Sequence, residues 1–363
     1  MKKKKLKPIW KIIPVILLIL LAYPTYLTVQ IVSKNYSFSS VFNIVSKGIK
    51  DEVLVRDYSK TLEVAINDNN FKKEYIDSYF TIEYHEKKNF IKRINNLLKV
   101  GYTEKDINGI NDKLSDDKVE SLYDYDHIKD ISKYLEFDYF KSENLYRYID
   151  YYVGDYQDAI VSVNIGLDKE FYTAANIITE FSEDVLANKY NKLDEAFEPK
   201  NISQIKESCV KGNNNQYLSK VAQVAFEKMC DAALEEDMHI LANSAYRSYT
   251  DQQNVYDTYL NLYGQNYVDN YVAVPGFSEH QTGLALDVAA KDYNTFKTSP
   301  EYTWMLENAY KYGFILRYPQ EKQDITGYKY EAWHFRYVGL EAAKYIQENN
   351  ITYEEYYVMF LDK

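Results

Sequence analysis

A long uncharged stretch that directly follows a block of lysines is the feature that most limits how this chain can fold. Residues 12–33 contain no charged side chain, whereas six of the first eleven residues are lysine. As a helix the stretch would be about 33 Å long, which is enough to cross the hydrocarbon core of a bilayer. A buried core helix would not carry such a block of lysines at one end. The pattern therefore predicts a transmembrane anchor at 12–33.

The lysines also predict the orientation of this anchor. A basic segment stays on the cytoplasmic side, so residues 1–11 are expected in the cytoplasm and the chain after Lys34 outside. Pro14 and Pro24 are tolerated because membrane helices accept proline. A cleaved signal peptide is the alternative, but the apolar run is long for one and no small-residue cleavage site follows it. We expect a single-pass protein of the cell membrane whose chain beyond Lys34 is extracellular.

The composition restricts the partners of the remaining chain. Acidic residues outnumber basic ones by 54 to 43, which gives a formal net charge of -11. Nucleic-acid binding depends on clustered lysine and arginine, so we expect no nucleic-acid partner. The 46% of hydrophobic residues is sufficient for a packed core, which excludes a globally disordered chain.

Residues 40–184 have the pattern of successive short helices. In one of them Ile91, Ile94 and Leu97 mark a single face, and Gly101 follows as a stop signal. This region carries no residue cluster that suggests chemistry. We therefore expect an all-helical spacer or interaction region.

Cys209 and Cys230 are the only cysteines of the chain. An oxidising exterior would permit a disulfide between them. Two buried free thiols remain an equal alternative, because two cysteines without a metal-binding spacing decide little.

The segment PGFSEHQTGLALDVAA is the first of two clusters that carry chemistry. Residues 283–288 alternate leucine and valine with smaller or polar residues, which predicts a strand with one apolar face. Asp287 lies on the opposite face, where Gly283 and Ala285 leave space beside its carboxylate. His280 precedes the strand in a loop. The carboxylate and this imidazole are in a position to converge on one cation.

The segment GYKYEAWHFRYVG is the second cluster. His334 and Arg336 share one face of a predicted strand. Glu331 can join His334 only if the chain bends near Ala332. Two histidines and one aspartate leave a tetrahedral zinc ion one open position, as catalytic zinc sites do. Glu331 is then a spare carboxylate with the chemistry of a general base.

These motifs together resemble a known family. The string Ser278-x-His280-x-x-Gly283-x-Ala285-x-Asp287, followed by Glu331-x-Trp333-His334, resembles the signature of VanY-type zinc D-alanyl-D-alanine carboxypeptidases and of the related L,D-carboxypeptidases, which trim peptidoglycan stem peptides. Residues 244–248, with Gln252 beyond them, resemble the substrate-binding motif of that family. The resemblance covers about residues 185–346. Ala245 replaces a usual glycine and Ala332 a common proline, which affects backbone geometry rather than reactive groups.

The resemblance implies the fold and the roles of these residues. It implies an α+β domain at 185–363, with a small antiparallel sheet, flanking helices and one zinc ion. The implied zinc ligands are His280, Asp287 and His334, the implied catalytic residues are Glu331 as base and Arg247, and the implied substrate-binding residues are Arg247, Gln252, Ser278 and Trp333. Arg247 would contact the terminal carboxylate of the substrate or the developing oxyanion, because a guanidinium pairs with a carboxylate in a bidentate manner.

The resemblance implies a carboxypeptidase that removes the terminal D-Ala from peptidoglycan stem peptides outside the membrane. An L,D-carboxypeptidase that acts on tetrapeptide stems is a first alternative, since the pocket around the penultimate residue decides that choice. A non-catalytic wall-binding protein on the same fold is a second alternative. The intact set of His280, Asp287, Glu331 and His334 argues against it.

Overall fold

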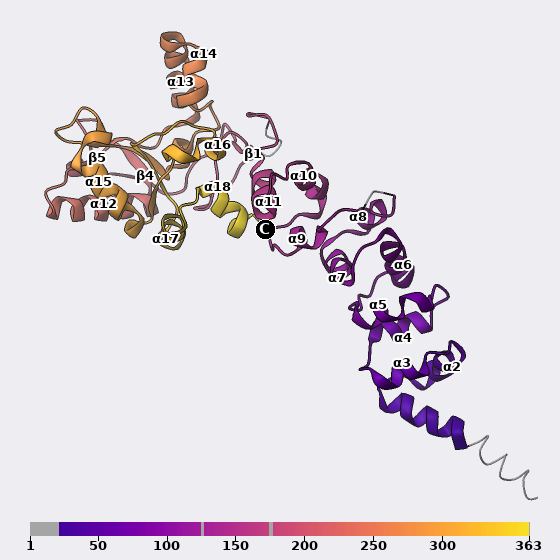
Figure 1. The fold of residues 1–363 in the computed structure, drawn as a ribbon. Helices are drawn as coiled ribbons and strands as arrows, with labels where there is room; N and C mark the ends of the chain where they lie inside the picture. Colours follow the sequence, from indigo (N-terminus) through magenta and orange to yellow (C-terminus); the bar gives the residue numbers. More distant parts are fainter. Residues whose placement is uncertain (1–21, 125–126, 174–176, 363) are drawn as a thin grey trace, which may run out of the picture. The chain divides into compact units, whose positions relative to one another are not determined.

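The computed structural model describes residues 22–124, 127–173 and 177–362 (Figure 1). The chain divides into two compact units, Met1–Glu143 and Asn144–Lys363. Each unit is described by itself below.

The first unit consists of short helices in the part that the structure describes. They are α2 (Phe38–Ser46), α3 (Lys50–Val55), α4 (Lys60–Ile66), α5 (Ile76–Thr81), α6 (Phe90–Val100), α7 (Glu104–Lys113), α8 (Asp116–Ser121) and α9 (Ile131–Leu135). In α6 the predicted face of Ile91, Ile94 and Leu97 is buried, and Gly101 ends the helix in the left-handed conformation with φ 111°. The helical pattern of the sequence is confirmed here.

The predicted anchor at 12–33 falls mainly on residues 1–21, which lie outside the described residues. Residues 22–33 are helical. Among residues 22–124, 127–173 and 177–362, no helix is both long enough and apolar enough to cross a bilayer.

The second unit begins with helices that the sequence placed in the spacer. These are α10 (Leu145–Asp150) and α11 (Tyr156–Ile165), and α11 packs against α18 (Tyr353–Tyr356) near the end of the chain. The prediction of an all-helical region to residue 184 is wrong in one respect, because β1 (Ile177–Ile178) pairs in parallel with β2 (Lys192–Leu193). A two-residue strand depends on its distant partner and leaves no pattern in the local sequence.

A four-stranded antiparallel sheet forms the centre of the second unit. Its strands are β5 (Ile240–Ser244), β6 (Ala285–Ala290), β7 (Phe314–Leu316) and β8 (His334–Tyr337), in the spatial order β5-β6-β8-β7. A second antiparallel pair joins β3 (Ile202–Gln204) to β4 (Tyr217–Ser219). The expectation of a mixed helix and sheet fold with small antiparallel sheets is confirmed.

Helices cover one face of this sheet and bury its apolar side chains. The helices of the second unit beyond α11 are α12 (Lys220–Glu235), α13 (Tyr249–Tyr263), α14 (Gln265–Tyr271), α15 (Pro300–Asn308), α16 (Gln323–Thr326), α17 (Leu340–Asn349) and α18. Phe226 of α12 and Met305 of α15 share a core with Leu286 of β6 and Phe335 of β8, and all four are fully buried. Such burial stabilises each side chain by roughly 1.5–3 kcal/mol. The opposite face of the central strands is free to carry polar groups.

The strand around Asp287 begins two residues later than the sequence predicted. Gly283 has φ +66°, which ends a 3-10 turn at Glu279–Thr282 before β6 starts at Ala285. A Cβ atom at Gly283 would lie 3.1 Å from the backbone nitrogen of Ser219. Glycine is therefore required by the turn and by close backbone packing.

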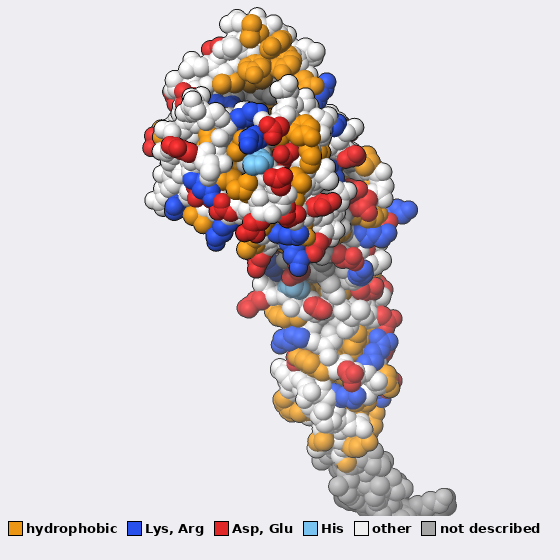
Figure 2. Space-filling view, turned by 90° about the vertical axis from the view of Figure 1, so that its left-hand side faces the viewer, with side chains coloured by type: hydrophobic (Ala, Val, Ile, Leu, Met, Phe, Trp, Pro, Cys, Tyr) orange, Lys and Arg blue, Asp and Glu red, His pale blue; other side chains and the backbone are white. Residues whose placement is uncertain are grey.

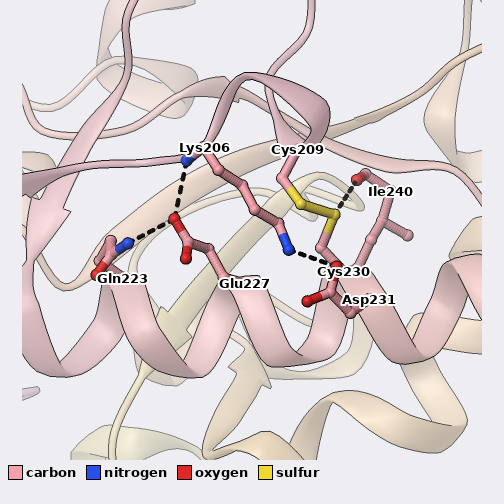
Figure 3. The surroundings of a disulfide bond; sticks show 7 residues. All are labelled: Lys206, Cys209, Gln223, Glu227, Cys230, Asp231 and Ile240. Carbon is pink, nitrogen blue, oxygen red and sulfur yellow. Dashed lines mark hydrogen bonds and ion pairs between the residues drawn. A yellow bond between two sulfur atoms is a disulfide. The ribbon is translucent and has the colours of Figure 1, made fainter.

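A disulfide joins Cys209 to Cys230 and decides between the two alternatives for these cysteines (Figure 3). It links the 3-10 turn Glu207–Cys209 to α12, across 21 residues of sequence. A bridge across a loop of this length stabilises a fold by about 3 kcal/mol, mainly by restricting the unfolded chain. Beside it, Glu227 accepts a hydrogen bond from the backbone N–H of Lys206 at 2.8 Å.

Candidate metal and catalytic site

Two adjacent strands and the turn before them place the predicted metal ligands together. Asp287 of β6 lies directly opposite His334 of β8 in the register of the sheet. His280 lies in the 3-10 turn Glu279–Thr282 that leads into β6. Ligand atoms of His280, Asp287 and His334 all lie within 4.8 Å of one another. The structure thus brings together the three residues that the two sequence clusters indicated.

The distances within this group suit a shared cation. Asp287 Oδ1 lies 3.5 Å from His280 Nε2 and 3.3 Å from His334 Nδ1. Asp287 Oδ1 is buried and has no hydrogen-bond partner. A buried carboxylate oxygen without a partner is costly, and a cation between it and two imidazole nitrogens would compensate it. The donor set of two nitrogens and one oxygen fits zinc.

Contacts behind each imidazole fix which nitrogen faces Asp287. His280 Nδ1 lies 2.7 Å from the carbonyl oxygen of Ala245, so a proton on Nδ1 is donated to that carbonyl and Nε2 is left as the donor to a metal. His334 uses its ring nitrogens in the opposite way. Its Nδ1 faces Asp287, and its Nε2 lies 3.5 Å from Glu279 Oε2. Metal-binding histidines commonly show this second contact to a carbonyl or carboxylate.

Glu331 lies beside the same group without belonging to it. A turn at 332–333 precedes β8 and provides the bend that the sequence required near Ala332. The turn places Glu331 Oε2 3.7 Å from His334 Nδ1. Burial raises the pKa of Glu331 to about 8, although the neighbouring His334 opposes this shift. A carboxyl group that titrates near neutral pH is suited to accept and return a proton.

Arg247 follows β5 and is joined to the same group through its backbone N–H, which donates to the carbonyl of His280 at 3.2 Å. Its two terminal nitrogens donate to Gln252 Oε1 at 2.7 Å and to Ser244 Oγ at 2.9 Å. Gln252 is buried and in turn donates to the carbonyl of Ala273 at 2.7 Å. These contacts use two of the five N–H groups of the guanidinium, so others remain for an anionic ligand.

The group of His280, Asp287 and His334 lines one cavity of about 180 Å³ together with Glu331 and Arg247. The predicted substrate-binding residues Arg247, Gln252, Ser278 and Trp333 all line it. The other lining residues are Val255, Tyr259, Tyr267, Tyr271, Val272, Ala273, Glu279, His280, Asp287, Tyr318, Tyr328, Glu331 and His334. Trp333 is 40% exposed at the rim, so the cavity combines buried polar groups with an aromatic border.

Four charged residues behind His334 were not identified from the sequence. We call Glu279, Arg317, Arg336 and Glu354 the buried charge network, and all four side chains are fully buried. Glu279 Oε1 accepts from Arg317 Nε at 2.8 Å and from Arg336 at 3.2 Å, while Arg317 forms a bidentate pair with Glu354. Burial opposes ionisation of Glu279, but the two guanidinium groups hold its pKa well below its usual range.

Glu279 and Arg336 had a signal in the sequence, because Glu279 stands between Ser278 and His280 and Arg336 lies two residues after His334. Arg317, which pairs with Glu279, lies 38 residues further along the chain, and Glu354, which pairs with Arg317, lies 37 residues beyond Arg317. The tyrosines of the cavity were likewise not identified, since 39 tyrosines in the chain made single ones uninformative.

The family model and the known proteins that this chain resembles are all described as carboxypeptidases. A family model described as D-alanyl-D-alanine carboxypeptidase (VanY) matches residues 215–340. The putative carboxypeptidase YodJ of Bacillus subtilis is 42% identical over 179 residues, which cover 47% of this chain and 66% of YodJ. The bifunctional D-Ala-D-Ala dipeptidase and D-Ala-D-Ala carboxypeptidase VanXYC of Enterococcus gallinarum is 37% identical over 40% of this chain and 80% of its own.

One further curated relative is matched over a smaller part of its length. A D-alanyl-D-alanine carboxypeptidase of Enterococcus faecium is 41% identical, and the chain spans 45% of it. Among solved structures, the LdcB LD-carboxypeptidase is 36% identical, with 52% of this chain and 98% of that chain covered and a TM-score of 0.46.

Proposed function

The chain belongs to the VanY family of D-alanyl-D-alanine carboxypeptidases, and we propose that it removes the terminal D-Ala from peptidoglycan stem peptides with the help of one zinc ion. The observation that carries the proposal is the group of His280, Asp287 and His334, which lines one cavity together with Glu331 and Arg247. Such a site has a place for a cation, a proton acceptor and a partner for a carboxylate.

The metal would be held by His280 Nε2, Asp287 and His334 Nδ1. When bound, a zinc ion supplies Lewis-acid polarisation of the scissile carbonyl and acidification of a water molecule. The carbonyl of Ala245 would keep the His280 imidazole oriented toward the ion, and the Glu279 carboxylate lies 3.5 Å from Nε2 of His334, where it would favour a proton on that nitrogen.

The remaining steps belong to side chains of this protein. The Arg247 guanidinium, held by Gln252 and Ser244, binds the C-terminal carboxylate of the substrate and so limits cleavage to the last residue. A carboxylate oxygen of Glu331 takes a proton from the attacking water and returns it to the leaving amine nitrogen. The burial of Glu331 keeps its pKa near neutral pH, where both transfers are favourable.

Product analysis of the purified protein tests this activity. Synthetic pentapeptide and tetrapeptide stems are incubated with and without a zinc chelator, and released D-Ala is measured. We expect release from the pentapeptide that the chelator abolishes. Release from the tetrapeptide alone would establish the L,D-carboxypeptidase alternative, and release from neither would support the non-catalytic one.

A substitution of Arg247 tests how the substrate's end is recognised. Arg247→Lys keeps the charge but loses the planar fork, so KM for a stem with a free C-terminus should rise about tenfold or more. The same stem with an amidated C-terminus provides the control substrate. Equal cleavage of the free and the amidated stem by the wild-type protein would contradict carboxylate recognition by Arg247.

We also propose that the protein is anchored at 12–33 with its catalytic unit outside the cell. The lysine block and the uncharged stretch after it support this orientation. Protease added to intact cells should then remove the chain beyond Lys34. Protection of that chain in cells whose surface is accessible would contradict the orientation.

A further inference from the structure

Four tyrosines form a row along the hairpin of α13 and α14. We call Tyr259, Tyr263, Tyr267 and Tyr271 the tyrosine wall. The rings of Tyr259 and Tyr267 are nearly parallel, at 7°, with centroids 5.8 Å apart. Tyr267 also contacts Tyr263 at 4.7 Å and Tyr271 at 5.0 Å. The four rings are therefore one continuous aromatic surface contributed by both helices.

This surface is not part of the hydrophobic core. Gln252 is the only buried residue of α13, and Tyr263 is 59% exposed. Figure 1 shows α13 and α14 extending from the second unit, and Figure 2 shows hydrophobic side chains gathered at the same end of the view. A soluble protein rarely exposes contiguous aromatic side chains unless they contact a ligand or partner.

The tyrosine wall is continuous with the candidate active site. Tyr259, Tyr267 and Tyr271 line the same cavity as Arg247 and Glu331. The base of the hairpin is held at the site, because Gln252 bonds both Arg247 and the carbonyl of Ala273. A substrate whose terminal carboxylate lies at Arg247 therefore has the tyrosine wall beside it.

The length of the wall shows which part of a substrate it can reach. From Gln252 to Tyr263 the helix rises about 16 Å at ~1.5 Å per residue. An extended peptide covers this distance with about five residues at ~3.3–3.6 Å each. A tripeptide bound at Arg247 would not reach Tyr263, whereas a complete stem peptide would bring the sugar at its amino end to that point.

The negative charge of the hairpin indicates which kinds of ligand it can bind. Residues 249–271 contain Asp251, Asp257 and Asp269 and no lysine or arginine. This composition disfavours an anionic polymer. Aromatic faces are electron-rich and pack well against the C–H face of a neutral sugar ring, while the tyrosine hydroxyls remain at the rim for hydrogen bonds.

We propose that the tyrosine wall binds the sugar that carries the stem peptide, so that the enzyme prefers stems attached to glycan over short free peptides. This inference rests on the proposed carboxypeptidase function. It assigns substrate selection to residues other than the proposed metal ligands, the proposed base and Arg247.

The test compares two substrates and two variants of the full-length protein. The substrates are a disaccharide pentapeptide and an N-acetylated tripeptide, both ending in D-Ala-D-Ala. We expect the wild-type kcat/KM to be about tenfold higher for the disaccharide pentapeptide. Tyr263→Ala should remove most of this preference and change kcat/KM for the tripeptide less than about twofold. Tyr293→Ala, at a tyrosine that is 39% exposed outside the tyrosine wall, should preserve the preference.

Direct binding separates recognition from turnover. In a Glu331→Gln background, which prevents turnover, the disaccharide pentapeptide should bind about tenfold more weakly when Tyr263→Ala is added. Equal kcat/KM values for both substrates in the wild-type protein, or an unchanged preference in Tyr263→Ala, would overturn the inference while the carboxypeptidase activity stands. Absence of D-Ala release from both substrates would instead contradict the proposed function.

Discussion

The buried charge network and the tyrosine wall both adjoin the candidate active site but differ in exposure, since Arg317 and Glu279 are fully buried whereas Tyr263 is 59% exposed. In the buried charge network each carboxylate has a fixed guanidinium partner and no access to water. The rings of the tyrosine wall contact one another, and Tyr259, Tyr263 and Tyr271 are exposed to solvent. On our proposal, the buried charge network holds the proposed metal ligands in place, while the tyrosine wall is available to select ligands with little effect on the free energy of unfolding.

Among the changes considered, removal of the Arg317 guanidinium from the buried charge network should lower the stability of the protein most. Arg317→Met leaves Glu279 and Glu354 buried without their shared cation, so we expect the free energy of unfolding to fall by about 3–5 kcal/mol. Urea denaturation followed by circular dichroism measures this change. Lys344→Met is the control, because its pair with Glu348 is exposed and contributes less than about 1 kcal/mol. A loss below about 1 kcal/mol in Arg317→Met would show that the buried charge network contributes no more to stability than an exposed ion pair.

The variant Glu279→Gln tests whether the buried charge network contributes to zinc affinity. It keeps the shape of the side chain but weakens the acceptor beside His334 Nε2, so zinc affinity should fall about 10–100-fold. Competition with a chelating dye measures the affinity of the folded protein. Glu301→Gln replaces another buried carboxylate that lies outside the cavity, and its zinc affinity should match that of the wild-type protein. Equal affinities of wild type and Glu279→Gln would show that the network has no part in holding the ligand.

Lys189 supports the hairpin and should give a smaller, pH-dependent effect. Its Nζ donates to the carbonyl of Asp269 in α14 at 2.7 Å and lies 4.5 Å from the ring centroid of Tyr328. Burial lowers its pKa to about 8 from 10.5. Between these pH values the unfolded chain binds more protons than the folded protein, so this lysine makes the free energy of unfolding rise with pH.

The variant Lys189→Met removes this contribution. The difference in unfolding free energy between wild type and variant should therefore increase in favour of the wild type from about pH 8 upward, by at most about 1.4 kcal/mol per pH unit. Denaturant titrations at several pH values measure it. A difference that does not change between pH 7 and 10 would contradict the lowered pKa of Lys189.

The strands that carry the metal group could be predicted from the sequence because their side chains alternate locally. The predicted strand around Asp287 differed from β6 by two residues at each end, and the bend before His334 was predicted correctly. The buried charge network could not be predicted, because its pairing depends on residues that are distant in sequence. Buried arginine and glutamate also look like surface residues in a single sequence.

The sequence contains only a weak pattern that indicates the tyrosine wall. Tyr259 and Tyr263, and likewise Tyr267 and Tyr271, are four residues apart, which is the spacing of one helix face. Their assembly into one surface requires that the chain reverses at Gly264, where φ is +79°. Periodicity alone does not show such a reversal between two helices, nor that a face remains exposed.

The central claim is that His280, Asp287 and His334 hold one zinc ion while Glu331 transfers the proton. The most direct measurement combines zinc content and turnover in Glu331→Gln. We expect about one zinc per chain, as in the wild-type protein, together with a kcat about 10²–10⁴-fold lower on the pentapeptide stem. Loss of the zinc would show that Glu331 is a ligand, and retention of wild-type turnover would show that it is not the base; either result would contradict the account.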